Sequence, residues 1–255
     1  MEEINYKKII DFVVESGKRL VTKSGNIKDI GVTKINLTEE DLAIERGLHE
    51  IIKSFSDDHL LYAEEENEVF YESKHLWVVD PISGTKNLIA GLAHYSIVVA
   101  HLIENKVVFA VVYDPSVDEL FVAYKGVGAF LNDKPIRVND KGNKKVILRP
   151  SSQWKDPDVI QRATDMLSGY EIENNTYSMA VNYCRVACGR SDGVISFTKD
   201  SFPEFAGGFI LREAGGHFTN IHGHSDIAPL DRIFIGGDEP IYGELLKISR
   251  EASKY

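Results

Sequence analysis

A six-residue turn at Asp80–Thr85, with the sequence DPISGT, combines the residue types that bind a divalent cation. It follows residues 76–79, an apolar run that predicts a buried strand. Pro81 fixes its own φ angle and makes the turn rigid, so that the Asp80 carboxylate and the Ile82 carbonyl face one point. Because Mg²⁺ prefers oxygen ligands, the turn predicts a magnesium site at the end of this strand.

The same turn has groups suited to a phosphate. Gly84 permits close approach of the backbone, and Thr85 adds a hydroxyl. Upstream, the acidic triplet Glu64–Glu66 ends another short apolar run. Charge runs are usually solvated surface, but this one ends a predicted strand, as Asp80 does. Two acidic strand ends beside a Gly-Thr pair predict a metal-dependent phosphatase.

A third element lies in the second half of the chain, at residues 203–208 (PEFAGG). Its small residues begin a predicted helix that ends at Gly215 and Gly216. Glu204, near the N-terminus of this helix, either complements the helix dipole or supplies a metal ligand from the second half of the chain. The sequence leaves both interpretations open.

The composition is that of a folded, acidic protein. The chain has 255 residues, of which 43% are hydrophobic, and a formal net charge of −10. This length fits one large domain or two closely joined ones, and the hydrophobic content excludes global disorder. The negative charge argues against general binding to nucleic acid or to an anionic membrane, although bound cations reverse the field locally.

The N-terminus lacks the pattern of a signal peptide, and no apolar run approaches the roughly 20 residues that a membrane span needs. Cys184 and Cys188 lie four positions apart and are expected to be small residues on one face of a helix. The sequence therefore predicts a cytoplasmic protein.

Hydrophobic periodicity predicts two N-terminal helices, at residues 4–22 and from Thr38 to about residue 55. Thr38 and Asp41 have the spacing of a capping box, with Thr38 as the N-cap. Residues 95–131 then contain four short β-rich runs separated by turn residues, which is typical of an antiparallel meander.

Residues 145–149 predict one more strand, and residues 150–157 are the best boundary between two halves. We expect an N-terminal α+β half at 1–150 with the metal and phosphate motif, and a C-terminal α/β half at 151–255 that contributes Glu204 and the substrate pocket. In the second half, predicted helices and strands alternate, which favours helices packed on a mixed sheet.

Together these motifs resemble the inositol monophosphatase family of metal-dependent, lithium-sensitive phosphatases. Its signatures are Asp-Pro-Ile/Leu-Asp-Gly-Thr and a later Trp-Asp-x-Ala-Ala-Gly, preceded by a Glu-Glu pair. The resemblance extends over nearly the whole chain and includes residues 37–41, 85–89, 113–115, 126–132 and 212–216. It implies a layered α-β-α-β-α sandwich of the α/β (α+β) class, and usually a homodimer.

The resemblance also implies a set of metal ligands. By motif position, Glu64, Asp80 and the Ile82 carbonyl hold a first Mg²⁺ (or Mn²⁺). Asp80 bridges to a second ion, which is completed by the residues at the remaining two motif positions, Ser83 and Glu204. Inhibition by lithium is expected with such a site.

For catalysis, the resemblance implies that a metal-activated water attacks the phosphorus of a small phosphorylated metabolite. Asp41 and Thr85 orient that water, while Glu65 and Asp41 face a third, weaker ion or its waters. The N–H groups of Gly84 and Thr85 hold phosphate oxygens. No nucleic acid and no membrane is expected as a partner.

The sequence departs from the family pattern at the second metal and in the substrate pocket. Ser83 replaces the second Asp of the first signature, so that the second metal loses one unit of negative charge. Pro203 and Glu204 stand in place of Trp-Asp, and Glu204 keeps the charge on a longer side chain. Ser178 lies in a segment that meets the substrate in the family, so Ser83 and Ser178 are expected beside the phosphate. The acidic residue expected around residues 196–197 is absent, although Asp200 follows in a segment one residue longer than usual.

Three outcomes fit these departures. The protein is a phosphatase with a weakened second metal, or a phosphatase for another ester such as a sugar phosphate or a nucleotide 3′-phosphate. Alternatively, it is a catalytically weakened or inactive member that acts as a binding or regulatory protein. The last outcome predicts binding of the first metal without hydrolysis.

Overall fold

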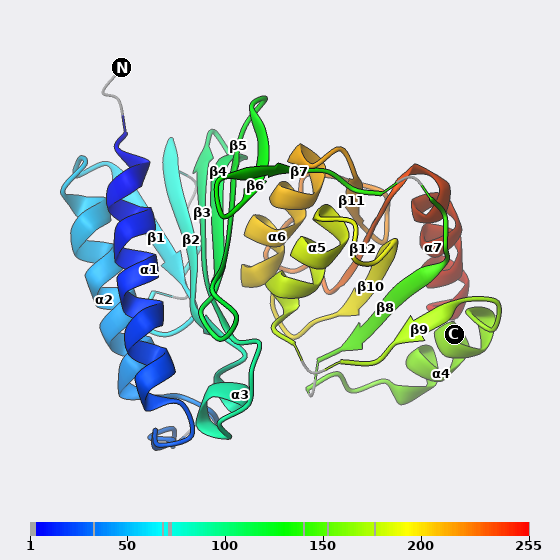
Figure 1. The fold of residues 1–255 in the computed structure, drawn as a ribbon, viewed down its shortest axis with the longest axis horizontal. Coiled ribbons are helices and arrows are strands. Elements are labelled where there is room, and N and C mark those ends of the chain that lie inside the picture. Colours follow the sequence, from blue (N-terminus) through cyan, green and yellow to red (C-terminus); the bar gives the residue numbers. More distant parts are fainter. Residues whose placement is uncertain are drawn as a thin grey trace.

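Two β-sheets alternate with three layers of helices in the computed structural model (Figure 1). It describes residues 4–32, 34–67, 69–70, 73–139, 141–151, 153–175 and 177–254. Three hydrophobic cores hold the five layers together, and one of them surrounds the central helices and contacts both sheets. The predicted α-β-α-β-α sandwich is therefore confirmed.

The first helical layer covers one face of the first sheet and consists of α1 (Tyr6–Lys23) and α2 (Glu39–Lys53). Thr38 is the N-cap of α2, and its backbone N–H and hydroxyl donate to the Asp41 carboxylate at 2.8 and 2.5 Å. The predicted capping box is thus present. Apolar side chains such as Leu48 are buried against the sheet.

The first sheet has seven strands in the order β1-β2-β3-β4-β5-β6-β7. They are β1 (His59–Ala63), β2 (His75–Ser83), β3 (Ser96–Ile103), β4 (Lys106–Asp114), β5 (Glu119–Tyr124), β6 (Gly128–Leu131) and β7 (Lys134–Ile136). β1 is parallel to β2, and each later pair of neighbours is antiparallel. The strands β3 to β6 are the predicted meander. The parallel start of the sheet brings the ends of β1 and β2, with their acidic residues, to one edge.

The central layer consists of α5 (Met179–Ala187) and α6 (Phe202–Glu213), which pack between the two sheets. Residues 202–211 of α6 are all buried, because both faces of the helix meet other elements. Gly208 makes this close packing possible: a Cβ at this position would lie 2.3 Å from the Phe218 ring.

The second sheet has five strands in the order β11-β12-β10-β8-β9. They are β8 (Lys145–Pro150), β9 (Glu171–Glu173), β10 (Gly193–Phe197), β11 (His217–Asn220) and β12 (Ile233–Gly237). β10 runs parallel to β8 and antiparallel to β12, so the sheet is mixed as predicted. α4 (Pro157–Met166) and α7 (Glu239–Ala252) form the outer layer, where the half-buried Trp154 packs on Phe197.

The structure differs from the sequence-based expectations at β8, α3 and the short strand β7. β8 precedes the expected boundary at 150 but pairs in the second sheet, so the chain passes between the sheets after β7. A short helix, α3 (Thr85–Ile89), follows the acidic turn and has too few residues to show a periodic pattern. Among the described residues, no helix combines the length and apolarity needed to cross a bilayer.

Candidate active site

Residues of both halves line a cavity of about 390 Å³ at the end of β2. Most of the predicted site residues line it, namely Glu64, Asp80, Ile82, Ser83, Gly84, Thr85, Ser178 and Glu204. Asp41 and Glu65 lie behind this lining. Asp41 accepts a hydrogen bond from the Thr85 hydroxyl at 3.1 Å, and Glu65 is 2.7 Å from the Lys34 ammonium group, which also lines the cavity.

An irregularity in β2 lets Asp80 and Ser83 line the same cavity. In a regular strand, residues three positions apart face opposite sides of the sheet. Here the pairing register of β2 with β3 shifts between Asp80 and Ser83, as in a β-bulge. Pro81 lies within the shift, where its missing N–H costs no ladder bond.

Three acidic side chains, Glu64, Asp80 and Asp200, form what we call the carboxylate cluster. The carboxyl groups of Glu64 and Asp80 are within hydrogen-bonding reach of each other, and Asp200 adds a third negative charge. Burial, together with the charges of Glu64 and Asp200, raises the pKa of Asp80 well above its usual value. Asp80 Oδ1 is buried and has no hydrogen-bond partner among the described residues. An orphaned carboxylate oxygen beside two further carboxylates fits a divalent cation.

Two lysines neutralise part of this charge. Glu64 Oε1 lies 2.6 Å from Lys199 Nζ and 3.2 Å from Lys34 Nζ. Burial would raise the pKa of Glu64, but the two ammonium groups outweigh it and hold that pKa below its usual value. Glu64 is therefore ionised at neutral pH.

Thr85 and Asp41 connect the turn to α2. The Thr85 hydroxyl lies 2.7 Å from the Ile82 carbonyl oxygen and 3.1 Å from Asp41 Oδ1, and it shares its proton between the two. Asp41 is fully buried, and this burial, reinforced by the charge of Glu65, raises its pKa to about 7 against the hydrogen bonds from Thr38. A buried acid with this pKa exchanges a proton near neutral pH.

Gly84 is the N-cap of α3, with a φ of +88° that strains any residue carrying a Cβ. A Cβ at Gly84 would lie 3.6 Å from the Ser178 Cβ, so the two predicted phosphate contacts are adjacent. The Ser178 hydroxyl already bonds Ser96 at 2.7 Å and accepts from the N–H of Val181 at the start of α5. Its contact with a substrate stays a prediction.

Glu204 faces a different environment from the carboxylate cluster. Its Oε1 accepts a hydrogen bond from the Tyr183 hydroxyl at 3.0 Å, and Tyr183 in turn bonds Ser196. Burial, with the charge of Asp200, raises the pKa of Glu204 well above its usual value. Its role as a metal ligand stays a prediction.

Asp200 was noted in the sequence only as an acidic residue near the absent one, whereas its position in the carboxylate cluster was not predicted. It precedes Pro203 and Glu204, in the loop between β10 and α6. Its position four residues before Glu204 was the signal that could have placed a carboxylate before the helix.

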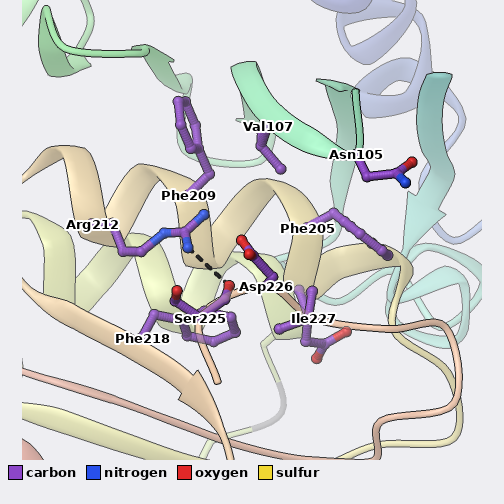
Figure 2. Close-up of a pocket in the computed structure, with 10 residues that line it drawn as sticks. Asn105, Val107, Phe205, Phe209, Arg212, Phe218, Ser225, Asp226 and Ile227 are labelled. Atoms are coloured by element: carbon purple, nitrogen blue, oxygen red, sulfur yellow. Dashed lines mark hydrogen bonds between the residues drawn. The ribbon is translucent and has the colours of Figure 1, made fainter. Parts of the chain in front are cut away.

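A second, smaller pocket lies beside α6 and has a volume of about 20 Å³ (Figure 2). Its walls are largely aromatic, from Phe205, Phe209 and Phe218, and Arg212 donates to the Ser225 carbonyl at 2.8 Å across it. This volume holds about one water molecule and excludes a metabolite.

Three histidines form another group of potential ligands, whose nitrogen atoms lie within 4.8 Å: His59, His75 and His101. His75 begins β2, at the opposite end from the acidic turn. The three rings are within 20° of parallel, and His59 stacks on His75. Because a nitrogen lone pair lies in the plane of its ring, such rings do not converge on one ion.

Hydrogen bonds explain this histidine group without a metal. The indole N–H of Trp77 donates to His59 Nδ1 at 3.0 Å, and Trp77 also stacks on His101 at 4.2 Å. His101 Nε2 lies 3.2 Å from His75 Nδ1. Burial and the neighbouring imidazoles lower the pKa of His101 to about 3, so that it stays neutral. The group is a hydrogen-bonded stack within the core.

The chain is similar to known proteins over most of its length. A fructose-1,6-bisphosphatase/inositol-1-monophosphatase from Thermotoga maritima is 30% identical over 233 residues, which cover 91% of this chain and 86% of that protein. The Nus factor SuhB of Haemophilus influenzae is 34% identical over 187 residues, or 71% of this chain and 70% of that protein.

The solved structure of a Thermotoga maritima IMPase matches the fold with a TM-score of 0.84 at 27% identity, covering 96% of each chain. The sequence pattern of the inositol monophosphatase family matches residues 7–254. The chain therefore belongs to the inositol monophosphatase family.

Proposed function

We propose that the protein is a Mg²⁺-dependent phosphomonoesterase that hydrolyses a small phosphate ester in the cavity at the end of β2. The observation that carries this proposal is the buried, unpartnered Oδ1 of Asp80 within the carboxylate cluster. A buried carboxylate oxygen without a partner is costly unless a cation or a donor satisfies it.

Glu64, Asp80, the Ile82 carbonyl and Asp200 are the groups that would hold Mg²⁺. Ser83 offers a neutral hydroxyl, and Asp200 supplies the negative charge that Ser83 lacks. When bound, the ion would lower the pKa of a water and neutralise charge that develops on the phosphoryl group.

The protein groups around the cluster would position the reactants. Asp41, with its pKa near 7, and the Thr85 hydroxyl would hold and accept a proton of the attacking water. The open backbone at Gly84 gives room for the phosphate. Arg149 lines the same cavity and adds positive charge for an anionic substrate, because its guanidinium donates to the backbone carbonyls of Tyr177 and Pro150 and forms no ion pair among the described residues.

The cavity volume favours a substrate of the size of a sugar or inositol phosphate. A nucleotide 3′-phosphate remains in the set to be tested. A homodimer and inhibition by lithium stay predictions for this protein.

The test is release of inorganic phosphate from a panel of inositol, sugar and nucleotide monophosphates with Mg²⁺ or Mn²⁺ present. We expect turnover of at least one ester, and a loss of about 10²-fold or more in kcat for Asp80→Asn, because a ligand for the cation is removed. Asp165→Asn, on the exposed surface of α4, is the matched control and should keep full activity. Absence of turnover for every ester and both metals would contradict the proposal.

A second candidate is a regulatory role without turnover. Its support is the neutral Ser83 in the cavity and the similarity to a relative named Nus factor SuhB. The phosphate-release panel separates the two: a protein that binds Mn²⁺ but hydrolyses none of the esters, while Ser83→Asp restores hydrolysis, would favour the regulatory role.

A further inference from the structure

Lys199 places an ammonium group inside the carboxylate cluster. Its Nζ lies 2.6 Å from Glu64 Oε1 and 3.4 Å from Asp200 Oδ2, and its charge also acts on Asp80. One lysine therefore contacts or faces all three members of the cluster. Lys199 follows β10 in the second half of the chain. Glu64 follows β1 of the first sheet, and Asp80 lies near the end of β2.

The second lysine of the cavity has a different position. Lys34 Nζ bonds the Glu64 backbone carbonyl at 2.8 Å and lies 2.7 Å from Glu65 Oε2. Lys34 Nζ also lies 3.2 Å from Glu64 Oε1, but among the described residues no ion pair joins it to Asp80 or Asp200. Lys199 is thus the cation that competes for the groups proposed to hold Mg²⁺.

Two residues, Ser83 and Lys199, reduce the negative charge of the site. Ser83 contributes no negative charge, and Lys199 adds a positive one. A site with three carboxylates and an internal ammonium group has less negative charge for divalent ions than three carboxylates alone. Two divalent ions beside a fixed ammonium group would repel it and one another at distances of a few ångströms, where Coulomb terms are large.

We propose that the Lys199 ammonium takes the place of one divalent cation, so that the cluster holds one Mg²⁺ fewer than it would without this lysine. The built-in cation offsets one of the negative charges of Glu64 and Asp200, and the remaining carboxylate charge of the cluster, with the Ile82 carbonyl, is left to the bound ion. The proposal deepens the proposed function and rests on it, because it assumes that the cluster binds Mg²⁺ at all.

The test counts bound ions and does not depend on turnover. Mn²⁺ replaces Mg²⁺, and the number of ions per chain is measured at saturation by isothermal titration calorimetry and by the electron paramagnetic resonance signal of free Mn²⁺. We expect Lys199→Met to bind one more Mn²⁺ per chain than the unaltered protein. Lys199→Arg keeps the charge and should match the unaltered protein.

Lys86→Met is the matched control, because Lys86 also lines the cavity but forms no ion pair with the cluster among the described residues. It removes the same charge and should leave the number of ions unchanged. If Lys199→Met does not fold, as judged by circular dichroism, Lys199→Gln takes its place with the same expectation.

The outcomes separate this inference from the proposed function. Equal numbers of Mn²⁺ in the unaltered protein and in both neutral Lys199 variants, with equal affinity, would overturn the inference and leave the phosphatase proposal standing. An extra ion in Lys86→Met as well would also overturn it, because the effect would then be general charge removal. No bound Mn²⁺ in any protein, together with no phosphate release, would refute the proposed function itself.

Discussion

Asp41 shows how a single residue links helix capping to the chemistry of the cavity. One carboxylate oxygen accepts bonds from Thr38 at the start of α2, and the other accepts from Thr85 next to Ile82. The carboxyl group is fully buried, so its charged form is disfavoured and its pKa rises from 3.8 to about 7. A group that anchors a helix is also the group that can exchange a proton at neutral pH.

The raised pKa of Asp41 predicts a particular pH dependence of stability. In metal-free protein, the folded state keeps this proton up to about pH 7, whereas the unfolded chain loses it near pH 3.8. Raising the pH between these values therefore favours unfolding, by up to roughly 4 kcal/mol for this group. Asp41→Asn removes that contribution.

Urea unfolding at several pH values, with a chelator present, measures this effect. The free energy of unfolding of the unaltered protein minus that of Asp41→Asn should fall as the pH rises from 4 to 7. A difference that is constant with pH would show that Asp41 titrates at its usual value. Asp165→Asn, which is exposed, serves as the comparison.

Sequence reasoning at the residue scale reached Glu64, Asp80 and the Gly84–Thr85 pair, because motif and strand end coincide there. It did not place Asp200 in the cluster, because this carboxylate comes from the loop between β10 and α6. Loop geometry of this kind depends on tertiary contacts, here the ion pair of the neighbouring Lys199 with Glu64, and leaves no periodic signal.

α6 determines how closely the two sheets approach each other. It lies between them, and its residues 202–211 are buried on all sides. The helix needs small residues where it meets other elements: Cβ atoms at Gly207 and Gly208 would lie 2.6 Å from the Tyr183 ring and 2.3 Å from the Phe218 ring. Close packing therefore requires glycine at these positions of α6, although glycine has a low helix propensity.

Two matched glycine substitutions test that statement. Gly208→Ala should lower the free energy of unfolding by about 1–3 kcal/mol, because the added methyl overpacks the core. Gly243→Ala in α7, where an added Cβ meets nothing within 4 Å, should raise it by up to about 1 kcal/mol through helix propensity alone. Chemical denaturation followed by circular dichroism measures both, and stabilisation by Gly208→Ala would contradict the packing argument.

Helices and strands with strong periodicity or clear turns were predictable from the sequence. The helices α1 and α2, the capping box and the meander are examples. α3 and β7 escaped because each spans only a few residues, and the membership of β8 in the second sheet depends on pairing with β10, which no local pattern encodes.

The whole molecule places its acidic groups across the junction of its two halves. Glu64 and Asp80 belong to the first half, and Asp200 and Glu204 come from the second. In a chain with a net charge of −10, buried carboxylates of this kind repel one another when no cation is bound. A cation held by both halves is thus expected to stabilise the fold as a unit.

Thermal unfolding with and without Mg²⁺ examines this expectation. At a Mg²⁺ concentration about 100-fold above Kd, linkage contributes about 2.7 kcal/mol, which raises Tm by roughly 5–10 °C. Removal of the metal with a chelator should return Tm to its lower value. Asp80→Asn should abolish the shift, whereas a shift of equal size in that variant would mean that Mg²⁺ stabilises the protein elsewhere.

The two tryptophans lie in different halves of the chain, and this gives the protein an internal optical reporter for each. Trp77 is sealed in the core of the first sheet against His101, and Trp154 is half-buried beside Phe197 of the second sheet. Replacing either indole by phenylalanine leaves one emitter. Fluorescence of the two single-tryptophan proteins then reveals whether the sheets melt in concert or one before the other.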